Sequence, residues 1–466
     1  MTAVDVVVMA AGKGTRMKSR TAKVLHRLGG RPLIQHVMDT AQALQARRTI
    51  VITGHGAEEV EAWLRASAAA AGRPSPDFVR QEPQLGTGHA VQQVVPVLPD
   101  DGIALILNGD VPLIRPETLR ALLERCGGQR LALLTVEMAD PAGYGRIVRQ
   151  GEAVRAIVEH KDASEAQRAI REVYTGFMAV PAKKLKAWLA RLTNDNAQGE
   201  YYLTDIVKFA VADGCEVVTS PASEQVEVDG VNSPLQLADL ERAFQRRQAR
   251  ALMEQGVRLA DPARFDLRGR LACGQDVEID VNCVFEGEVT LGDNVRIGPN
   301  CVIANASIGP GVVIQACTHI DGEKQGVQVG EGARIGPFAR LRPGAQLGAE
   351  VHIGNFVEVK NSTLARGAKA NHLAYLGDAT VGERVNYGAG SITANYDGVN
   401  KHHTVIEADV RVGSNCVLVA PVTVAKGGTI GAGSVISKDT PPDALTVARA
   451  KQVSLTGWQR PKKQPK

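Results

Sequence analysis

The sequence predicts two domains of different class. These are a Rossmann-like α/β domain with a mostly parallel sheet in the N-terminal half and a left-handed parallel β-helix of hexapeptide repeats in the C-terminal half. Apolar strand-like runs alternate with helical patterns in the first half. In the second half an aliphatic residue recurs at every sixth position. At 466 residues the chain is also longer than a single core usually grows.

The N-terminal half contains short apolar runs separated by amphipathic patterns. The predicted strands are residues 4–9, 49–53, 104–107 and 131–136, and the predicted helices include residues 32–44 and 58–70. Strands separated by helices indicate parallel pairing, because the chain must cross over before it returns to the sheet.

One amphipathic helix is predicted between the halves. Ser233 and Pro234 form a typical helix start, and Gly256 can end the helix. Its apolar stripe is Leu237, Leu240, Phe244 and Ala251. We expect a long exposed arm that joins two domains. The expected boundaries are a domain over 1–234, a linker helix over 235–255 and a second domain over 256–466.

The six-residue period predicts three short strands per turn of a triangular coil, each with one aliphatic residue pointing inward. The expected inward residues are Leu291, Ile297, Ile303, Val329, Ile335, Leu341, Leu347, Ile353, Val359, Val381, Tyr387, Ile406, Val412, Leu418, Val424, Ile430 and Ile436. The register breaks near residues 315–328, 361–380 and 394–405. Loops that leave a regular coil often carry function.

Composition argues against several classes of partner. Net charge is only +4 and aromatic content is 4%, so neither a nucleic acid nor a membrane partner is expected. The seven cysteines are scattered and contain no Cys-x-x-Cys pair, which suits a reducing cytoplasm. We find no signal peptide and no apolar run long enough to span a membrane. The basic tail around Arg460–Lys463 is interpreted as a solvated end.

The loop after the first predicted strand is rich in glycine. It contains Gly12 and Gly14, and Arg16 and Lys23 follow closely. Glycines let backbone N–H groups approach phosphates, and fixed positive charge is what phosphoryl transfer requires. The loop is neither a Walker loop nor a dinucleotide fingerprint, and a plain tight turn is the alternative.

This loop resembles that of the sugar-1-phosphate nucleotidyltransferases, and further segments follow in the order typical of that family. They are residues 81–90, 108–110, 143–146, 158–161, 199–205 and 230–232. The resemblance implies that Asp110 and Asn232 hold Mg²⁺ and that Arg16 and Lys23 are catalytic. The implied UTP and sugar-nucleotide contacts are Met9, Ala10, Ala11, Gly12, Lys23, Gln81, Gly86, Thr87, Asn108, Gly109, Asp110, Gly145, Glu159, Tyr174 and Asn232. Tyr174 and Asn108 depart from the family pattern, which commonly has Asn and Tyr at these respective positions.

Two cations in the coil are spaced by one full turn. Arg342 and Lys360 each follow an inward aliphatic residue and lie 18 positions apart, so they should stack roughly 4.8 Å apart. An anion such as a sugar phosphate would relieve their repulsion, while a solvated basic edge is the alternative. Close by in the register break lies His372, which suits the pKa range of a base that takes a proton from an amine.

The second half resembles the acetyltransferase domain of bifunctional N-acetylglucosamine-1-phosphate uridylyltransferases/glucosamine-1-phosphate acetyltransferases. The segments that match are residues 335–344, 354–360, 372–378 and 395–398. The resemblance implies a homotrimer in which His372 is the base, and a product, UDP-N-acetylglucosamine, that feeds peptidoglycan and lipopolysaccharide synthesis. Implied glucosamine-1-phosphate contacts are Arg342, Lys360, Tyr375 and Asn386. Implied acetyl-CoA contacts are Ala389, Asn395, Tyr396, Ser414, Ala432 and Arg449.

Two other functions remain open from the sequence. The first is a single-activity sugar-1-phosphate nucleotidyltransferase with a structural β-helix, and Arg342, Lys360 and His372 argue against it. The second is a non-catalytic assembly factor, and the intact Arg16, Lys23 and Asp110 argue against that.

Overall fold

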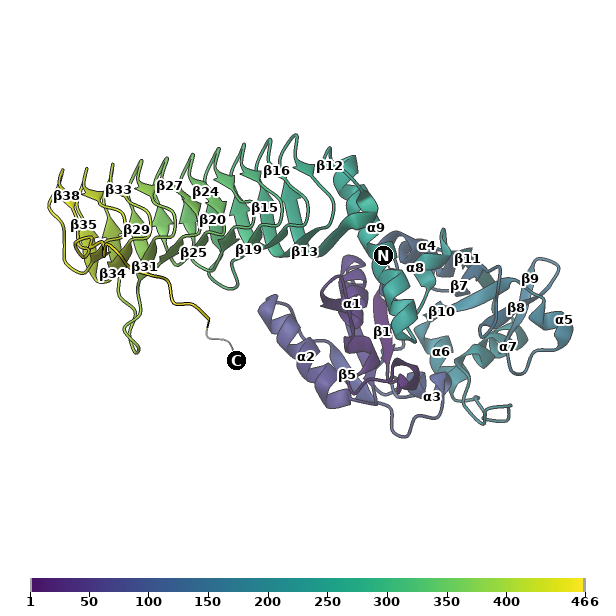
Figure 1. The fold of residues 1–466 in the computed structure, drawn as a ribbon. Coiled ribbons are helices and arrows are strands. Elements are labelled where there is room, and N and C mark those ends of the chain that lie inside the picture. Colours follow the sequence, from purple (N-terminus) through teal and green to yellow (C-terminus); the bar gives the residue numbers. More distant parts are fainter. Residues whose placement is uncertain (1, 464–466) are drawn as a thin grey trace. The chain divides into compact units, whose positions relative to one another are not determined.

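The computed structural model describes residues 2–463, and the chain divides into two compact units between Phe244 and Gln245 (Figure 1). None of the helices in the described chain is long and apolar enough to cross a membrane. The division falls inside α9 (Pro234–Glu254), within the segment expected to be a linker.

A nine-stranded sheet forms the centre of the first unit. Its main path is β11 (Val217–Pro221), β7 (Leu131–Glu137), β10 (Glu172–Pro181), β6 (Ile103–Asn108), β1 (Val4–Ala10), β4 (Arg48–Thr53) and β5 (Asp77–Arg80). β1 pairs in parallel with β4 and β6, whereas β10 is antiparallel to both of its neighbours on that path. β8 (Gly145–Gln150) and β9 (Ala153–Val158) form a hairpin beside β10. The expected mostly parallel α/β sheet is confirmed.

Helices cover both faces of this sheet. They are α1 (Leu33–Ala43), α2 (Ala57–Ala70), α3 (Thr87–Gln92), α4 (Pro116–Cys126), α5 (Glu165–Arg168), α6 (Ala182–Leu189), α7 (Ile206–Ala212) and α8 (Gln225–Val228). Successive residues of a strand point to opposite faces, so Val6 and Val8 enter one core cluster and Val7 enters the other. A small hairpin, β2 (Arg27–Leu28) and β3 (Arg31–Pro32), leads into α1.

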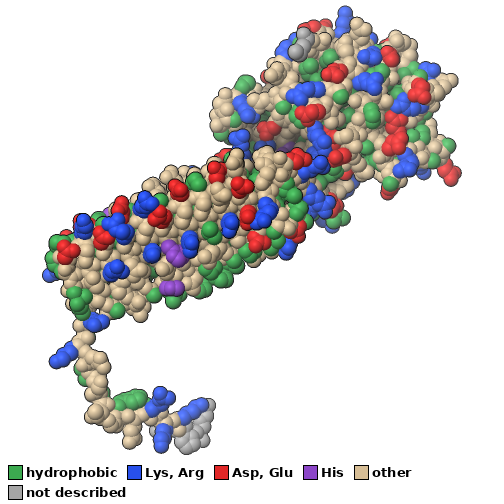
Figure 2. Space-filling model, turned by 90° about the horizontal axis from the view of Figure 1, so that it is seen from above, with side chains coloured by type: hydrophobic (Ala, Val, Ile, Leu, Met, Phe, Trp, Pro, Cys, Tyr) green, Lys and Arg blue, Asp and Glu red, His purple; other side chains and the backbone are tan. Residues whose placement is uncertain are grey.

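The second unit is a coil of parallel strands. One face is β12 (Arg258–Leu259), β14 (Glu278–Ile279), β16 (Arg296–Ile297), β18 (Val313–Ile314), β21 (Arg334–Ile335), β24 (His352–Asn355), β27 (Lys369–His372), β30 (Asn386–Tyr387), β33 (Arg411–Val412), β36 (Thr429–Ile430) and β38 (Leu445–Thr446). All pairings between these strands are parallel. In the face shown in Figure 2, basic and acidic side chains are interspersed along the coil.

The other two faces are branches that separate at long strands bent around a corner. Those long strands are β13 (Phe265–Cys273), β15 (Cys283–Leu291) and β17 (Val302–Ile308). One branch is β19 (His319–Asp321), β22 (Arg340–Leu341), β25 (Glu358–Lys360), β28 (Tyr375–Gly377), β31 (Ile392–Ala394), β34 (Val417–Val419) and β37 (Val435–Ile436). The other is β20 (Val327–Val329), β23 (Gln346–Leu347), β26 (Thr363–Leu364), β29 (Ala379–Val381), β32 (Thr404–Ile406) and β35 (Val422–Val424).

Every residue that the six-residue period places inward is buried in the coil, and none is more than 4% exposed. The predicted β-helix is therefore confirmed down to individual side chains. Tyr387 fits because the residue one turn earlier in its column is the small Ala370. The tyrosine ring thus fills space that an aliphatic residue would otherwise occupy.

The register breaks turn out to be smaller than expected. Residues 361–380 do not leave the coil: Leu364, Ala370 and Leu376 are buried inside it, and Val359 pairs with Leu376, 17 residues on rather than 18. The steps from Val359 to Leu364 and from Leu376 to Val381 are five residues long, so the six-residue period is interrupted there. Between β18 and β20, β19 continues the coil, and only the loop between β19 and β20 departs from it. Of the three register breaks, only residues 394–405 contain a hairpin loop, so Val381 pairs with Ile406, 25 residues on.

The helix α9 is less exposed than its stripe suggested. Leu240 is buried in the first unit with Phe244 packed beside it, while Ala249 and Leu252 join the core of the second. Ala251, expected in the stripe, is exposed. Gln245 is buried, and its amide both accepts from the N–H and donates to the carbonyl of Leu267 on β13. A polar residue therefore ties the helix to the coil, a contact that the apolar pattern could not reveal.

Candidate active sites

The first unit has a cavity of about 460 Å³ at the carboxyl ends of β1 and β6. Ligands bind at this edge in open parallel sheets because strand-to-helix loops gather there. Its lining includes ten residues expected from the sequence: Met9, Ala10, Ala11, Gly12, Lys23, Gln81, Gly86, Thr87, Asn108 and Asp110. The fold thus brings the glycine-rich loop, the 81–90 segment and the end of β6 to one place.

Lys23 reaches across this cavity to Asp110. Its ammonium is ion-paired with the Asp110 carboxylate and lies 3.3 Å from the side-chain oxygen of Asn232. The pair is mostly buried, with the two side chains 14% and 17% exposed. One cationic nitrogen therefore marks the point on which the two expected metal ligands converge.

The residues at this point fit a hard divalent cation. Mg²⁺ prefers oxygen ligands and is commonly held by one or two carboxylates together with substrate phosphates and water. Asp110 and Asn232 supply one carboxylate and one amide oxygen, and both face an ammonium group. Among residues 2–463 no three His, Cys, Asp or Glu side chains form a metal cluster.

The 81–90 segment is fixed against the segment around Tyr201. The Gln81 side-chain amide donates to the Gly86 carbonyl at 2.9 Å, and the Thr87 hydroxyl accepts from the Leu203 N–H at 3.1 Å. Gly86 has φ +104°, and a Cβ there would approach the Tyr201 carbonyl to 2.7 Å. Only glycine combines this backbone with this close approach, so Gly86 sets the shape of the loop at the cavity.

Gly145 and Glu159 lie together beside β10. A Cβ on Gly145 would approach the Ile157 side chain to 2.7 Å and would lie 3.6 Å from both carboxylate oxygens of Glu159, so only glycine fits here without displacing Ile157. Glu159 accepts a hydrogen bond from the Thr204 hydroxyl at 2.8 Å, and burial raises its pKa above the ordinary value. These residues do not line the 460 Å³ cavity. They form a separate polar group on the β8–β9 hairpin and the chain that follows it.

Tyr174 is buried and its hydroxyl has no hydrogen-bond partner in the described chain. Burial and the nearby Glu159 carboxylate raise its pKa well above the ordinary range. Asn108, the second departure from the family pattern, lies against Gly176, where an added Cβ would collide with the Asn108 amide. Both unusual residues thus lie close to β10, near the residues expected to hold the sugar.

Five expected contacts, Gly109, Gly145, Glu159, Tyr174 and Asn232, do not line the cavity, and neither does Arg16. Arg16 is exposed on a short 3₁₀ turn, Thr15–Met17. Lys13, Gln84 and Glu200 line the cavity instead, although the sequence did not single them out. They could have been predicted from their positions, since each lies inside or next to a segment that resembles the family.

One turn of the coil is called a rung here. Arg342 and Lys360 lie on neighbouring rungs, each directly after one of the paired residues Leu341 and Val359. The Arg342 guanidinium is paired with Glu358 at 2.7 Å, so one anion of the chain already lies in this column. Lys360 keeps a lowered pKa, first through partial desolvation and then through Arg342 and Lys401. Lys401 is a third cation here that the sequence did not reveal, because it is brought in by the hairpin that follows β31.

His372 ends β27 rather than lying in a loop. The Asn355 side-chain oxygen is 2.8 Å from its Nδ1, which leaves Nε2 free when Nδ1 carries the proton. The His372 carbonyl accepts from the Gly390 N–H at 3.2 Å, so Ala389 lies one rung further on at the same corner. The Asn415 N–H donates to the Ala389 carbonyl at 2.7 Å, and the Gly433 N–H donates to the Ser414 carbonyl at 2.8 Å. His372, Ala389, Ser414 and Ala432 therefore form one column, and Arg449 donates to the Ala432 carbonyl at 2.5 Å.

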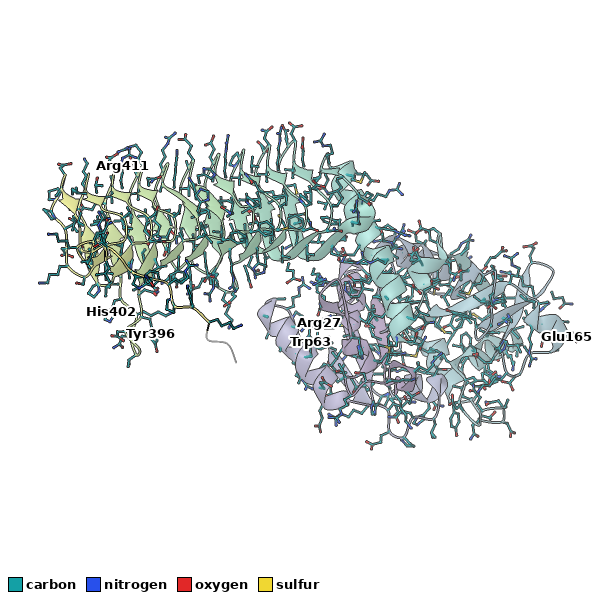
Figure 3. All side chains as sticks on the ribbon, in the orientation of Figure 1. Arg27, Trp63, Glu165, Tyr396, His402 and Arg411 are labelled. Atoms are coloured by element: carbon teal, nitrogen blue, oxygen red, sulfur yellow. The ribbon has the colours of Figure 1, made fainter. Side chains whose placement is uncertain are left out.

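Asn395 and Tyr396 lie elsewhere, at the base of the hairpin that follows β31. Figure 3 shows Tyr396 and His402 together on this hairpin, well apart from Arg411 on the β33 face. Tyr375 lies on β28 with its ring over Gly377, the register partner of Lys360. Asn386 lies on the β30 face. Within one chain the expected acetyl-CoA contacts occupy two corners, and Asn386 is on a different face from Arg342, Lys360 and Tyr375.

Comparisons with known proteins agree with a nucleotidyltransferase-like first unit and a hexapeptide-repeat coil. Residues 6–179 match a model described as a MobA-like NTP transferase domain. Residues 273–305 and 326–361 match the bacterial transferase hexapeptide, and residues 403–438 match the hexapeptide repeat of succinyl-transferase.

Curated relatives match along the whole chain. A protein from Paracidovorax citrulli is 71% identical over 476 residues, covering 100% of both chains. One from a Polaromonas species is 71% identical over 99% of both chains. One from an Azoarcus species is 58% identical over 99% of this chain and 100% of its own. All three are named bifunctional protein GlmU. The match confirms the resemblance, and with it the expectation of an enzyme with uridylyltransferase and acetyltransferase activities. The chain belongs to the family of bifunctional GlmU proteins.

Proposed function

We propose that this enzyme makes UDP-N-acetylglucosamine in two steps at separate sites. The coil transfers an acetyl group from acetyl-CoA to glucosamine-1-phosphate, and the first unit transfers uridylyl from UTP to the resulting N-acetylglucosamine-1-phosphate, releasing pyrophosphate. The proposal rests on two sites in one chain. The first is a cavity next to a glycine-rich loop, with Lys23 paired to Asp110. The second is a corner of the coil where His372 is followed, rung by rung, by the small residues Ala389, Ser414 and Ala432. We also propose that residues 1–234 and 256–466 divide the two activities across the 235–255 helix.

In uridylyl transfer, the sugar-phosphate oxygen attacks the α-phosphoryl group of UTP in line and pyrophosphate leaves. Asp110 and Asn232 would hold Mg²⁺, which when bound supplies positive charge to the phosphates. Lys23, with Arg16 moving in from the surface, neutralises the charge that develops on the α-phosphoryl group. Backbone N–H groups around Gly12 face the phosphates, while Gln81, Gly86 and Thr87 hold the uracil. Gly145, Glu159 and Tyr174 hold the N-acetylglucosamine. No protein nucleophile is needed, because positioning and charge supply the catalysis.

In acetyl transfer, Arg342, Lys360 and Lys401 bind the phosphate of glucosamine-1-phosphate. Partial burial lowers the pKa of Lys360 first, and the neighbouring Arg342 and Lys401 lower it further. Cations that repel each other in this way gain from an anion bound between them. His372 Nε2 takes a proton from the ammonium form of the amine, and the freed lone pair attacks the thioester carbonyl. The C–S bond then breaks, and CoA leaves as a thiol after taking up a proton. Asn355 holds the imidazole in place. Ala389, Ser414 and Ala432 offer a small-residue corner along which acetyl-CoA extends from His372 towards Arg449.

We propose that the enzyme is a homotrimer formed through the β-helix and that it acts in the cytoplasm. A single chain keeps Asn395 and the Ala389 column at different corners, and a neighbouring copy that supplies one of them would complete the site. All seven cysteines are free thiols, which suits a reducing compartment.

The decisive experiment incubates the protein with glucosamine-1-phosphate, acetyl-CoA, UTP and Mg²⁺. We expect free thiol, pyrophosphate and UDP-N-acetylglucosamine to be released together. Asp110→Asn should stop pyrophosphate release alone, and His372→Ala should slow thiol release alone. Pyrophosphate release from N-acetylglucosamine-1-phosphate without any thiol release from acetyl-CoA would instead favour a single-activity nucleotidyltransferase with a structural coil.

A further inference from the structure

We propose that Asp378 is a positioning residue for acetyl transfer: its carboxylate orients the Asn395 amide so that Asn395 presents an oxygen, rather than an N–H group, to acetyl-CoA. This inference rests on the proposed function, which assigns Asn395 to acetyl-CoA. Asp378 itself has no assigned role there, and it lies where the rung of Lys360 meets the base of the hairpin.

Asp378 is a buried carboxylate, only 8% exposed, between two asparagine side chains. One oxygen accepts from the Asn361 amide at 2.5 Å, and the other accepts from the Asn395 amide. Its backbone N–H donates to the Lys360 carbonyl at 3.2 Å, and its carbonyl accepts from the Thr404 N–H at 3.1 Å. The residue is thus fixed by four hydrogen bonds between the phosphate-binding rung and the strand that follows the hairpin.

A carboxylate can only accept hydrogen bonds, whereas an asparagine amide has one donor end and one acceptor end. Both Asn361 and Asn395 must therefore turn their nitrogen towards Asp378. The side-chain oxygen of Asn395 then faces the other way, and within residues 2–463 nothing donates to it. It is available to accept from an N–H of acetyl-CoA.

The same contact anchors the hairpin. The Asn395 carbonyl accepts from the His402 N–H at 2.8 Å, and the His402 ring is paired with Asp397 at 2.7 Å. Lys401 precedes His402 in this hairpin, and after partial burial it is one of the two cations, with Arg342, that lower the pKa of Lys360. Asp378 therefore holds the base of the loop that brings Lys401 to the sugar-phosphate column.

Two variants separate orientation from simple packing. In Asp378→Asn, the new amide offers one acceptor to the two neighbouring amides, so the Asn395 side chain loses its fixed orientation and can turn over to present an N–H to its ligand. Combining Asp378→Asn with Asn395→Asp restores both bonds, because the new asparagine accepts from Asn361 and donates to the new aspartate. The side chain at 395 again offers an oxygen to acetyl-CoA.

The test measures kcat and KM of acetyl transfer for the full chain, with uridylyl transfer as the internal control. We expect Asp378→Asn to raise the KM for acetyl-CoA about tenfold. The double variant should return it to within about threefold of wild type. Glu350→Gln, which removes an exposed coil carboxylate paired with Arg366, should leave both KM values unchanged.

Asn395→Ala distinguishes the two levels of the proposal. If it leaves the KM for acetyl-CoA unchanged, the assignment of Asn395 to acetyl-CoA is wrong. If it raises that KM while Asp378→Asn does not, only the positioning role fails. A double variant no better than Asp378→Asn also overturns that role. The KM of the double variant tests the positioning role even if Asp378→Asn is less stable, because the double variant keeps both hydrogen bonds.

Discussion

Lys23 donates a hydrogen bond to the carboxylate of Asp110, which lies 87 residues further along the chain. The contact joins the end of the glycine-rich loop to the end of β6. Because Asn232 approaches the same ammonium from the start of α9, three distant segments meet at one charged point. Each of these side chains can therefore be tested by its effect on uridylyl transfer alone.

Asp110→Asn should reduce uridylyl transfer at least about 10²-fold and leave acetyl transfer unchanged. An amide keeps the shape of the side chain but lacks the charge that a hard cation favours. Pyrophosphate and thiol release are measured on one preparation. Asp100→Asn, which loses only an exposed pair with Lys186, is the matched control. Equal loss of both activities in Asp110→Asn would contradict a separate site.

His372→Ala should slow thiol release from acetyl-CoA by about 10²- to 10⁴-fold and leave uridylyl transfer unchanged. Asn355→Ala should slow it less, by about tenfold, because the base remains but its ring orientation is lost. The acidic limb of the pH profile should disappear in His372→Ala and persist in Asn355→Ala. Near-normal acetylation by His372→Ala would remove the histidine from the mechanism.

Lys401→Ala should raise the KM for glucosamine-1-phosphate about tenfold with a smaller effect on kcat. Removing one of three neighbouring cations weakens phosphate binding, and it also makes binding less sensitive to salt. Steady-state kinetics at two ionic strengths measures both effects. Lys438→Ala, an exposed lysine further along the coil, should change neither. An unchanged KM in Lys401→Ala would place the phosphate elsewhere.

Gly176→Ala should impair uridylyl transfer and lower stability. Gly176 has φ +91°, which L side chains rarely adopt, and a Cβ there would collide with the Asn108 amide at the cavity. We expect a cost of about 1–3 kcal/mol and a displaced Asn108. Gly151→Ala, also at positive φ but with open space around it, should cost stability without loss of activity. Full activity in Gly176→Ala would exclude Asn108 from the site.

Glu61→Gln should lower the free energy of unfolding of the first unit by about 1–2 kcal/mol at pH 7. Hydrogen bonds from Arg80 hold the pKa of this buried carboxyl below its ordinary value. A lowered pKa stabilises the fold above the unfolded value of about 4.3, and this contribution is lost as pH falls through the folded pKa. The difference between wild type and variant should therefore shrink on acidification, followed by fluorescence of Trp63 and Trp188. A difference that grows would contradict the assignment.

The sequence predicted the coil well because its period reports burial directly. Each inward side chain must be apolar in a closed coil, so spacing alone identified Ile353, Tyr387 and Leu418. The prediction weakened where inward steps shortened to five residues, and there His372 was placed in a loop instead of at the end of a strand. The helix stripe was wrong at Ala251 because α9 packs on two sides, and a single stripe cannot describe two contacts.

Site residues were recognisable where they lie within one short segment, as in the glycine-rich loop. Lys401 was missed because its approach to Lys360 depends on how far the hairpin folds back, which local pattern does not encode. Asn355 could have been found, since it precedes His372 by 17 residues and thus by one rung. Arg16 lies on the surface of the structure, and its part in the reaction remains a prediction.

The long rung that contains the hairpin after β31 leaves its neighbours undisturbed, since Val381 still pairs with Ile406 and Tyr387 with Val412. Lengthening a connection from 18 to 25 residues costs less than about 0.6 kcal/mol in closure entropy. Each rung bonds only to the rungs beside it, so the cost does not spread along the coil. New recognition loops can therefore be inserted at a corner, one at a time, during evolution or by design. The scaffold therefore accepts changes in loop length at the corner where we propose that acetyl-CoA is bound.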